Sequence, residues 1–194
     1  DDKKLVMVAH SMGGLVSRYM VEELGGDQFV DRLIMAGTPN GGSKFGEIPG
    51  YVSWASVALA LGTRLFPPQV GAVTGFLSTV LKVGNKGVLY TLAQMDSGSD
   101  FIRKLTGKTS APIPYYIIGG DLDAYLNANG GLPLMEKVVT QIGTWVYRNT
   151  INDIAVGTDS IFLAKTAAEP QKVSCNHLNY FVIGESVDAL ARLL

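Results

Sequence analysis

A single serine stands between a short apolar run and a helical pattern near the start of the chain. Residues 5–8 are all apolar, which is typical of a fully buried strand. After Ser11, apolar residues at helical spacing predict a helix over residues 12–24. The small residues Ala9 and Gly13 flank the serine and leave room for a sharp turn. The sequence therefore predicts a strand, a tight turn and a helix in succession, with Ser11 on the turn.

This arrangement suits a nucleophile. A serine on a strained turn between strand and helix presents its hydroxyl at the end of the strand. The amides at the start of the following helix can stabilise negative charge that develops nearby, and the Met12 amide is the first of them. An ordinary helix cap is the alternative interpretation, but the flanking strand and helix favour catalysis. We expect Ser11 to be the nucleophile and the backbone of Met12 to bind the oxyanion.

Several segments resemble one protein family. Residues 9–14, Ala-His-Ser-Met-Gly-Gly, resemble the nucleophile segment of α/β-hydrolases of the lipase and esterase kind. Residues 33–43 resemble the next strand and its Gly-Thr-Pro-x-x-Gly-Ser loop, and residues 152–156 and 176–177 resemble the acid and histidine segments. The resemblance implies an α/β fold with a mostly parallel sheet, and a serine hydrolase that cleaves carboxylic esters through an acyl-enzyme.

The general base can be sought by elimination. A serine at neutral pH needs a partner that takes its proton, and histidine titrates in the right range. The chain has two histidines. His10 is bonded next to Ser11, so its side chain is directed away from that of the serine, and we expect it to pack beside the turn. His177 remains as the candidate base, in agreement with the serine, acid, histidine order of the resembled family.

The acid must lie between the third predicted strand and His177, where it can hold the second ring nitrogen. Four aspartates qualify by position: Asp121, Asp123, Asp153 and Asp159. Asp153 is the candidate, because it lies in the segment that resembles the acid segment of the family. Asp121, at the tip of the predicted strand, is the alternative. Asp159 is expected to cap a helix that begins at the next residue.

Alternating strand and helix signals predict a mostly parallel sheet. Strands are expected at residues 5–9, 32–37, 114–119 and 172–175. A terminal helix over residues 185–194 is expected to bury one face, made of Val187, Leu190, Ala191 and Leu194. The chain divides into a core part with the nucleophile (1–44), an insertion (45–110), and the rest of the core with acid and histidine (111–194).

The insertion is strongly apolar. Between residues 48 and 81 its one charged side chain is Arg64, and apolar helices are predicted at 54–65 and 70–83. Both are too short to cross a membrane. An insertion beside the carboxyl ends of the strands, where ligands bind in such sheets, predicts a helical cap with an acyl-chain lining. A satellite core is the alternative. The expected substrate contacts are Trp54, Leu59, Phe66 and Phe76.

Composition narrows the classes of partner. Sixteen basic and seventeen acidic side chains give a net charge of −1, which provides no surface for nucleic acid. The single cysteine, Cys175, excludes an internal disulfide and a cysteine-based zinc site, and we expect it to be a buried apolar residue. No cofactor or metal is expected. The lack of disulfides favours the cytoplasm but leaves secretion open.

The resembled fold places several strands before the nucleophile strand, and one loop there supplies a second oxyanion amide. Here the first predicted strand begins at residue 5. We expect an upstream segment or a second chain to complete the sheet, since an uncovered apolar edge promotes aggregation. Three hypotheses follow: a hydrolase of a small-molecule or lipid ester, an acyltransferase that uses the same triad, and a non-catalytic fragment of a larger protein.

Overall fold

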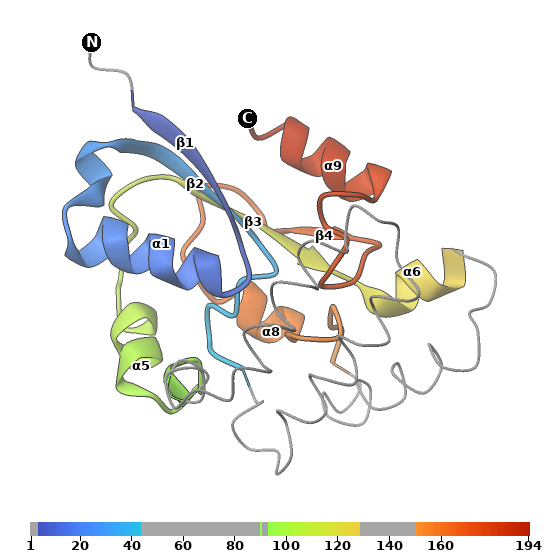
Figure 1. Ribbon diagram of the computed structural model, residues 1–194, viewed down its shortest axis with the longest axis horizontal. Coiled ribbons are helices and arrows are strands. Elements are labelled where there is room, and N and C mark those ends of the chain that lie inside the picture. Colours follow the sequence, from blue (N-terminus) through green and yellow to red (C-terminus); the bar gives the residue numbers. More distant parts are fainter. Residues whose placement is uncertain (1–3, 44–89, 91–92, 129–149) are drawn as a thin grey trace.

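The computed structural model describes residues 4–43, 90, 93–128 and 150–194, and these form an α/β fold (Figure 1). Four strands make one sheet in the order β1-β2-β3-β4, and each neighbouring pair is parallel. The strands are β1 (Leu5–His10), β2 (Val30–Ala36), β3 (Tyr115–Gly120) and β4 (Gln171–Val173). The predicted α/β fold with a mostly parallel sheet is confirmed.

Helices cover both faces of the sheet (Figure 1). They are α1 (Met12–Glu23), α5 (Asp100–Thr106), α6 (Leu122–Ala128), α8 (Thr158–Ile161) and α9 (Gly184–Ala191), with a 3₁₀ turn η1 at Gly26–Gln28. Val21 of α1 and Ile161 of α8 pack on one face, and Ala189 of α9 packs on the other. Among the described helices, none is long and apolar enough to cross a bilayer.

The strand β2 lies in the middle of this packing. Leu33 and Met35 face α1 and α8, whereas Ile34 and Ala36 face α9, as the alternation of side chains along a strand requires. All four side chains are fully buried. A strand that is buried on both faces has a continuous run of apolar residues, and this run makes β2 recognisable in the sequence.

The parallel register brings the carboxyl ends of the strands to one edge of the sheet. His10 lies opposite Ala36, Ala36 lies opposite Ile118, and Gly120 lies opposite Val173. The segments that leave these ends therefore start close together, although they are far apart in the sequence. This edge is where ligands bind in open α/β sheets.

One edge of the sheet is open in the described part of the chain. Within those residues no strand pairs with β1 on the side away from β2. Leu5 is 63% exposed, Val6 39% and Val8 40%, although all three belong to an apolar strand. Exposure of this kind is unusual for a strand of a parallel sheet, whose faces and edges are normally covered.

Two sequence expectations about helices are wrong. The core-facing residues of α9 are Ser186, Ala189 and Leu190, while Val187 and Leu194 are exposed. The buried face is displaced by one residue because the small side chains of Ser186 and Ala189 allow close approach to the sheet. Asp159 is not a helix cap: it lies in the first turn of α8, which begins at Thr158 after Gly157.

The apolar insertion lies largely outside the described residues, which omit 44–89 and 91–92. The expected substrate contacts fall there too: Trp54, Leu59, Phe66 and Phe76. Of the range 45–110, the described helix α5 packs against α1 through Ile102 and Leu105, which contact Leu15. Cys175 is fully buried, just beyond the end of β4.

Candidate active site

Ser11 occupies a strained turn directly after β1. Its backbone angles are φ 53° and ψ −132°, in the left-handed half of conformational space that side chains with a Cβ rarely adopt. Such a conformation costs about 1–2 kcal/mol and persists only where its surroundings hold it. The Ser11 amide donates to the Ala36 carbonyl at 3.0 Å, and the Ser11 carbonyl accepts from the Gly14 amide at 3.0 Å.

The first turn of α1 packs tightly against the end of β2. A Cβ added at Gly14 would lie 2.0 Å from Thr38 Oγ1 and 2.6 Å from Thr38 Cγ2, both belonging to a fully buried residue. A Cβ added at Gly13, the preceding residue, would meet no atom within 4 Å. The second glycine therefore sets how closely α1 approaches the sheet, and with it the position of the Met12 amide at the helix start.

Three side chains from distant parts of the sequence meet at this turn. His177 Nε2 lies 2.9 Å from Ser11 Oγ, and His177 Nδ1 lies 2.7 Å from Asp153 Oδ2. Asp153 is fully buried, and His177 is 8% exposed. The structure thus brings Ser11, His177 and Asp153, which the sequence singled out, into one hydrogen-bonded series.

The direction of these hydrogen bonds follows from the chemistry of the groups. An ionised carboxylate can only accept, so His177 Nδ1 carries a hydrogen and donates it to Asp153. In the neutral imidazole the other nitrogen, Nε2, then has a free lone pair. That nitrogen faces Ser11 Oγ and can accept its proton. The arrangement can therefore generate a nucleophilic oxygen on Ser11.

Asp153 is held by its own turn. Its Oδ1 accepts from the amides of Ala155 at 3.0 Å and Val156 at 2.8 Å. Ile154 has a positive φ of 83°, which lets the chain fold back around the carboxylate. The Asp153 carbonyl accepts from the His177 amide at 2.7 Å, so the acid and the histidine are linked through their backbones as well.

Asp121, the alternative acid, lies outside the hydrogen-bonded series of Ser11, His177 and Asp153. Its Oδ2 is 3.0 Å from Lys172 Nζ, and its Oδ1 accepts from the Ala124 amide at the start of α6 at 3.0 Å. Asp121 therefore pairs with a lysine of β4 and caps a helix. The carboxylate beside the His177 ring is that of Asp153.

His10 packs behind the histidine of this series. Its Nε2 lies 2.8 Å from the His177 carbonyl, to which it can only donate, and the two imidazole rings are 4.7 Å apart. Its ring also lies near those of Tyr180 and Phe181. Burial, and then the neighbouring His177, lower the pKa of His10 from 6.5 to about 4. His10 is therefore neutral at physiological pH.

Sequence reasoning missed Tyr180. This residue is 1% exposed, and its hydroxyl lies 2.9 Å from Asp153 Oδ2 and 2.6 Å from the Gly120 amide. Both partners are remote in the sequence, so local patterns could not reveal the contact. The one available signal was the pair of glycines at the end of β3, since glycine near a strand end often marks a close approach.

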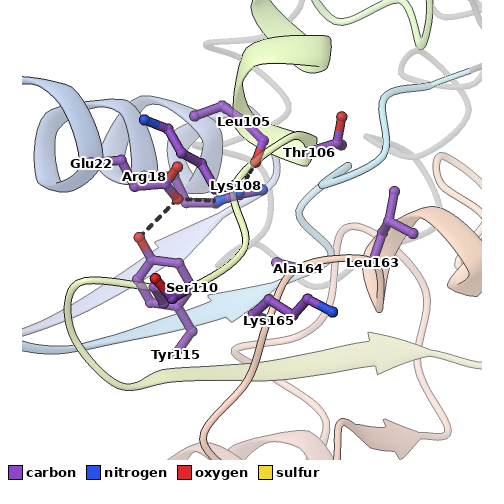
Figure 2. A pocket seen from close by; sticks show the side chains of 11 residues that line it. Arg18, Glu22, Leu105, Thr106, Lys108, Ser110, Tyr115, Leu163, Ala164 and Lys165 are labelled. Atoms are coloured by element: carbon purple, nitrogen blue, oxygen red, sulfur yellow. Dashed lines mark hydrogen bonds and ion pairs between the residues drawn. The ribbon is translucent and has the colours of Figure 1, made fainter.

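A small cavity lies away from the Ser11 site, between α1 and the end of α5 (Figure 2). Its volume of about 30 Å³ would hold water rather than an organic substrate. Figure 2 shows Arg18 and Glu22 of α1 facing Tyr115 of β3, and the Arg18 and Tyr115 side chains both donate to Glu22 Oε1 at 2.9 Å. We interpret this buried network as structural, because it fastens α1 to the sheet.

No group of three histidine, cysteine, aspartate or glutamate side chains in the described ranges is placed to hold a metal ion. The Met12 amide is the first of α1, where backbone N–H groups have no acceptor within the helix. It adds a donor beside the serine.

Comparisons with known proteins bear on the family and the fold. One family matches the chain over its full length, residues 1–194. The chain belongs to the family described as Domain of unknown function (DUF7379). No curated protein sequence matches it.

The solved structures similar to this DUF7379 chain include a lipase, Bacillus licheniformis BlEst2. Its mature form has a TM-score of 0.63 and 18% identity, over 98% of this chain and 65% of the lipase chain. Its propeptide form has a TM-score of 0.46 and 19% identity, over 91% of this chain and 32% of that one. The mature form shows that the two chains share an α/β fold, and that this chain spans 65% of that lipase chain.

Proposed function

We propose that this DUF7379 chain carries the active site of a serine ester hydrolase, with Ser11 as nucleophile, His177 as general base and Asp153 as orienting acid. The observation that carries the proposal is the series Asp153–His177–Ser11, with bonds of 2.7 and 2.9 Å, at a strained turn that opens a helix. The lipase-like fold is consistent with it. At 18% identity that likeness does not by itself imply an activity.

In the proposed reaction Ser11 Oγ attacks the ester carbonyl carbon while its proton passes to His177 Nε2. Asp153 stabilises the imidazolium, and the Met12 amide donates to the oxyanion of the tetrahedral intermediate. The C–O bond to the alcohol then breaks as His177 returns the proton to the leaving oxygen. Water, deprotonated by His177, attacks the acyl-enzyme in the second half. The second tetrahedral intermediate collapses by breaking its bond to Ser11 Oγ, which takes back the proton from His177 Nε2, and the carboxylic acid is released.

The test is a change of the proposed nucleophile with a matched serine as control. Ser11→Ala should lose ester turnover and labelling by a fluorophosphonate probe, while circular dichroism stays unchanged. Ser17→Ala, on the helix that follows Ser11, should keep both, since the Ser17 hydroxyl donates to the Gly13 carbonyl of its own helix. Labelling that survives Ser11→Ala would contradict the proposal. In the wild type, product analysis with an added alcohol distinguishes hydrolysis from acyl transfer.

We also propose that a strand from an upstream segment or from a second chain covers the outer edge of β1. The support is the exposure of Leu5, Val6 and Val8 along a strand that is apolar throughout. A strand added there would extend the sheet on the side of the Ser11 turn. Such pairing gives its affinity through backbone hydrogen bonds.

A further inference from the structure

The hydroxyl of Tyr180 has one proton, and its two partners determine where that proton goes. The Gly120 amide, 2.6 Å away, can only donate, so Tyr180 Oη accepts from it. The Asp153 carboxylate, 2.9 Å away, can only accept, so Tyr180 donates to Oδ2. Burial, and then the charge of Asp153, raise the pKa of Tyr180 well above its ordinary value, so the donor keeps its proton.

The oxygen that receives this proton also serves the histidine. Asp153 Oδ2 accepts from His177 Nδ1 at 2.7 Å and from Tyr180 at 2.9 Å. Two donors therefore share the negative charge of one carboxylate oxygen. A hydrogen bond to an ionised group is about twice as strong as a neutral one. The two donors therefore compete for this oxygen, and the loss of one strengthens the bond to the other.

The place of Tyr180 is built into the ends of two strands. Gly37, which follows β2 with φ 58°, leaves space for both groups: a Cβ there would lie 2.7 Å from Tyr180 Cε2 and 2.8 Å from Asp153 Oδ2. At Gly120, the end of β3, a Cβ would lie 2.8 Å from Asp153 Cβ and 3.0 Å from Tyr180 Oη. At Gly37 any other residue would displace the tyrosine or the carboxylate, and at Gly120 it would also meet the Cys175 carbonyl, 2.7 Å from the added Cβ.

We propose that Tyr180 is a positioning residue that fixes Asp153 Oδ2 and, by competing with His177 for that oxygen, sets the pH at which His177 becomes a base. This inference rests on the proposed function of the Ser11 site. It assigns a function to a buried side chain that does not touch the substrate. Without the Tyr180 hydroxyl, more of the carboxylate charge would fall on His177, and the protonated ring would be favoured.

The variant Tyr180→Phe removes only the hydroxyl. In it the acidic limb of the kcat/KM profile should move to higher pH by about 0.5–1 unit, because part of a charge-assisted hydrogen bond is transferred to His177. Tyr116→Phe is the matched control. Tyr116 lies on β3 and packs against the same apolar cluster as Tyr180, and we expect its loss of a hydroxyl to leave the profile unchanged.

A titration of the His177 ring by NMR tests the inference without any activity. The chain has two histidines, and the pKa of His10 is lowered to about 4, which identifies the signal of that ring. The His177 midpoint should rise in Tyr180→Phe. It should fall when 3-fluorotyrosine, a stronger donor of nearly the same shape, stands at position 180, which also covers the case that Tyr180→Phe does not fold.

The outcomes separate the two proposals. If the ring titration moves in these opposite directions but no ester is cleaved, the positioning inference stands and the proposed hydrolase function fails. If esters are cleaved through Ser11 but the midpoint does not move in the folded variants, the inference about Tyr180 is overturned. A shift of equal size in Tyr116→Phe would also overturn it, since the effect would then not be specific to this hydroxyl.

Discussion

At the scale of single residues, the burial of His10 makes the unfolding free energy depend on pH. The folded chain holds its pKa at about 4, whereas the unfolded chain has the ordinary value of 6.5. Between these values the unfolded state binds a proton that the folded state does not. Stability therefore falls as pH falls through this window, and is fully present above pH 6.5.

We predict that the wild-type chain loses about 2 kcal/mol more unfolding free energy than His10→Gln between pH 7 and pH 5. Glutamine keeps an amide donor at the position of Nε2, which can still reach the His177 carbonyl, but it does not titrate. Urea unfolding at both pH values measures the difference, and comparing the two chains cancels the contribution of the carboxylates. Equal losses in both would mean that His10 takes up its proton over the same pH range in the folded and the unfolded chain.

The sequence predicted the three side chains that the structure joins, those of Ser11, His177 and Asp153, because each has a rare residue type or a specific sequence context. With two histidines in the chain, the choice between His10 and His177 rested on the geometry of neighbouring residues and on the serine, acid, histidine order of the resembled family. Asp153 was chosen among four aspartates because its segment resembles the acid segment of that family. The role of Tyr180 could not be predicted from the sequence, since its partners Gly120 and Asp153 become neighbours only when the sheet forms. Contacts made across strand ends are invisible to any local pattern.

At the scale of elements, the contact between α1 and β2 decides where the start of the helix stands. Gly13 and Gly14 are adjacent in sequence but face different surroundings. A Cβ at Gly14 would overlap the Thr38 side chain, and a Cβ at Gly13 would lie in open space. Comparing alanine substitutions at the two positions therefore separates the effect of crowding against Thr38 from the general effect of replacing a glycine in a helix.

We predict that Gly14→Ala lowers the unfolding free energy by about 1–3 kcal/mol through overpacking. Gly13→Ala should instead raise it by up to about 1 kcal/mol, because alanine is the better helix former. Chemical denaturation of both variants measures the two effects. If Gly14→Ala raises the unfolding free energy as Gly13→Ala does, α1 can shift at no cost and Thr38 does not limit its approach.

The strands were predicted to within two residues at each end, because buried parallel strands are short, apolar and bounded by glycine or polar residues. The face of α9 was harder. Its apolar residues fit two helical stripes that share Leu190, and Ser186 and Ala189 carry little hydrophobic signal. Close packing selected the stripe with smaller side chains, a choice that depends on the sheet rather than on the helix sequence.

At the scale of the whole molecule, the open edge of β1 has two kinds of backbone amide. Leu5 donates to the Phe29 carbonyl at 2.8 Å and Ser11 to the Ala36 carbonyl at 3.0 Å, so alternate residues point toward β2. The amides of Val6 and Val8, which lie between them, point to the outer edge. Those two amides report directly whether another strand lies there.

We predict that in the 194-residue chain alone, at low concentration, the Val6 and Val8 amides exchange with solvent far faster than those of Met7 and Ala9. The amides of Leu33 and Met35, on β2 between two strands, are the protected control. Residue-resolved hydrogen exchange measures all six. Slowing with rising concentration would identify a second copy as the cover, and slowing only in a longer form of the protein would identify an upstream segment. If Val6 and Val8 are as protected as Leu33 in the dilute chain, the edge is already covered and the proposed partner strand is unnecessary.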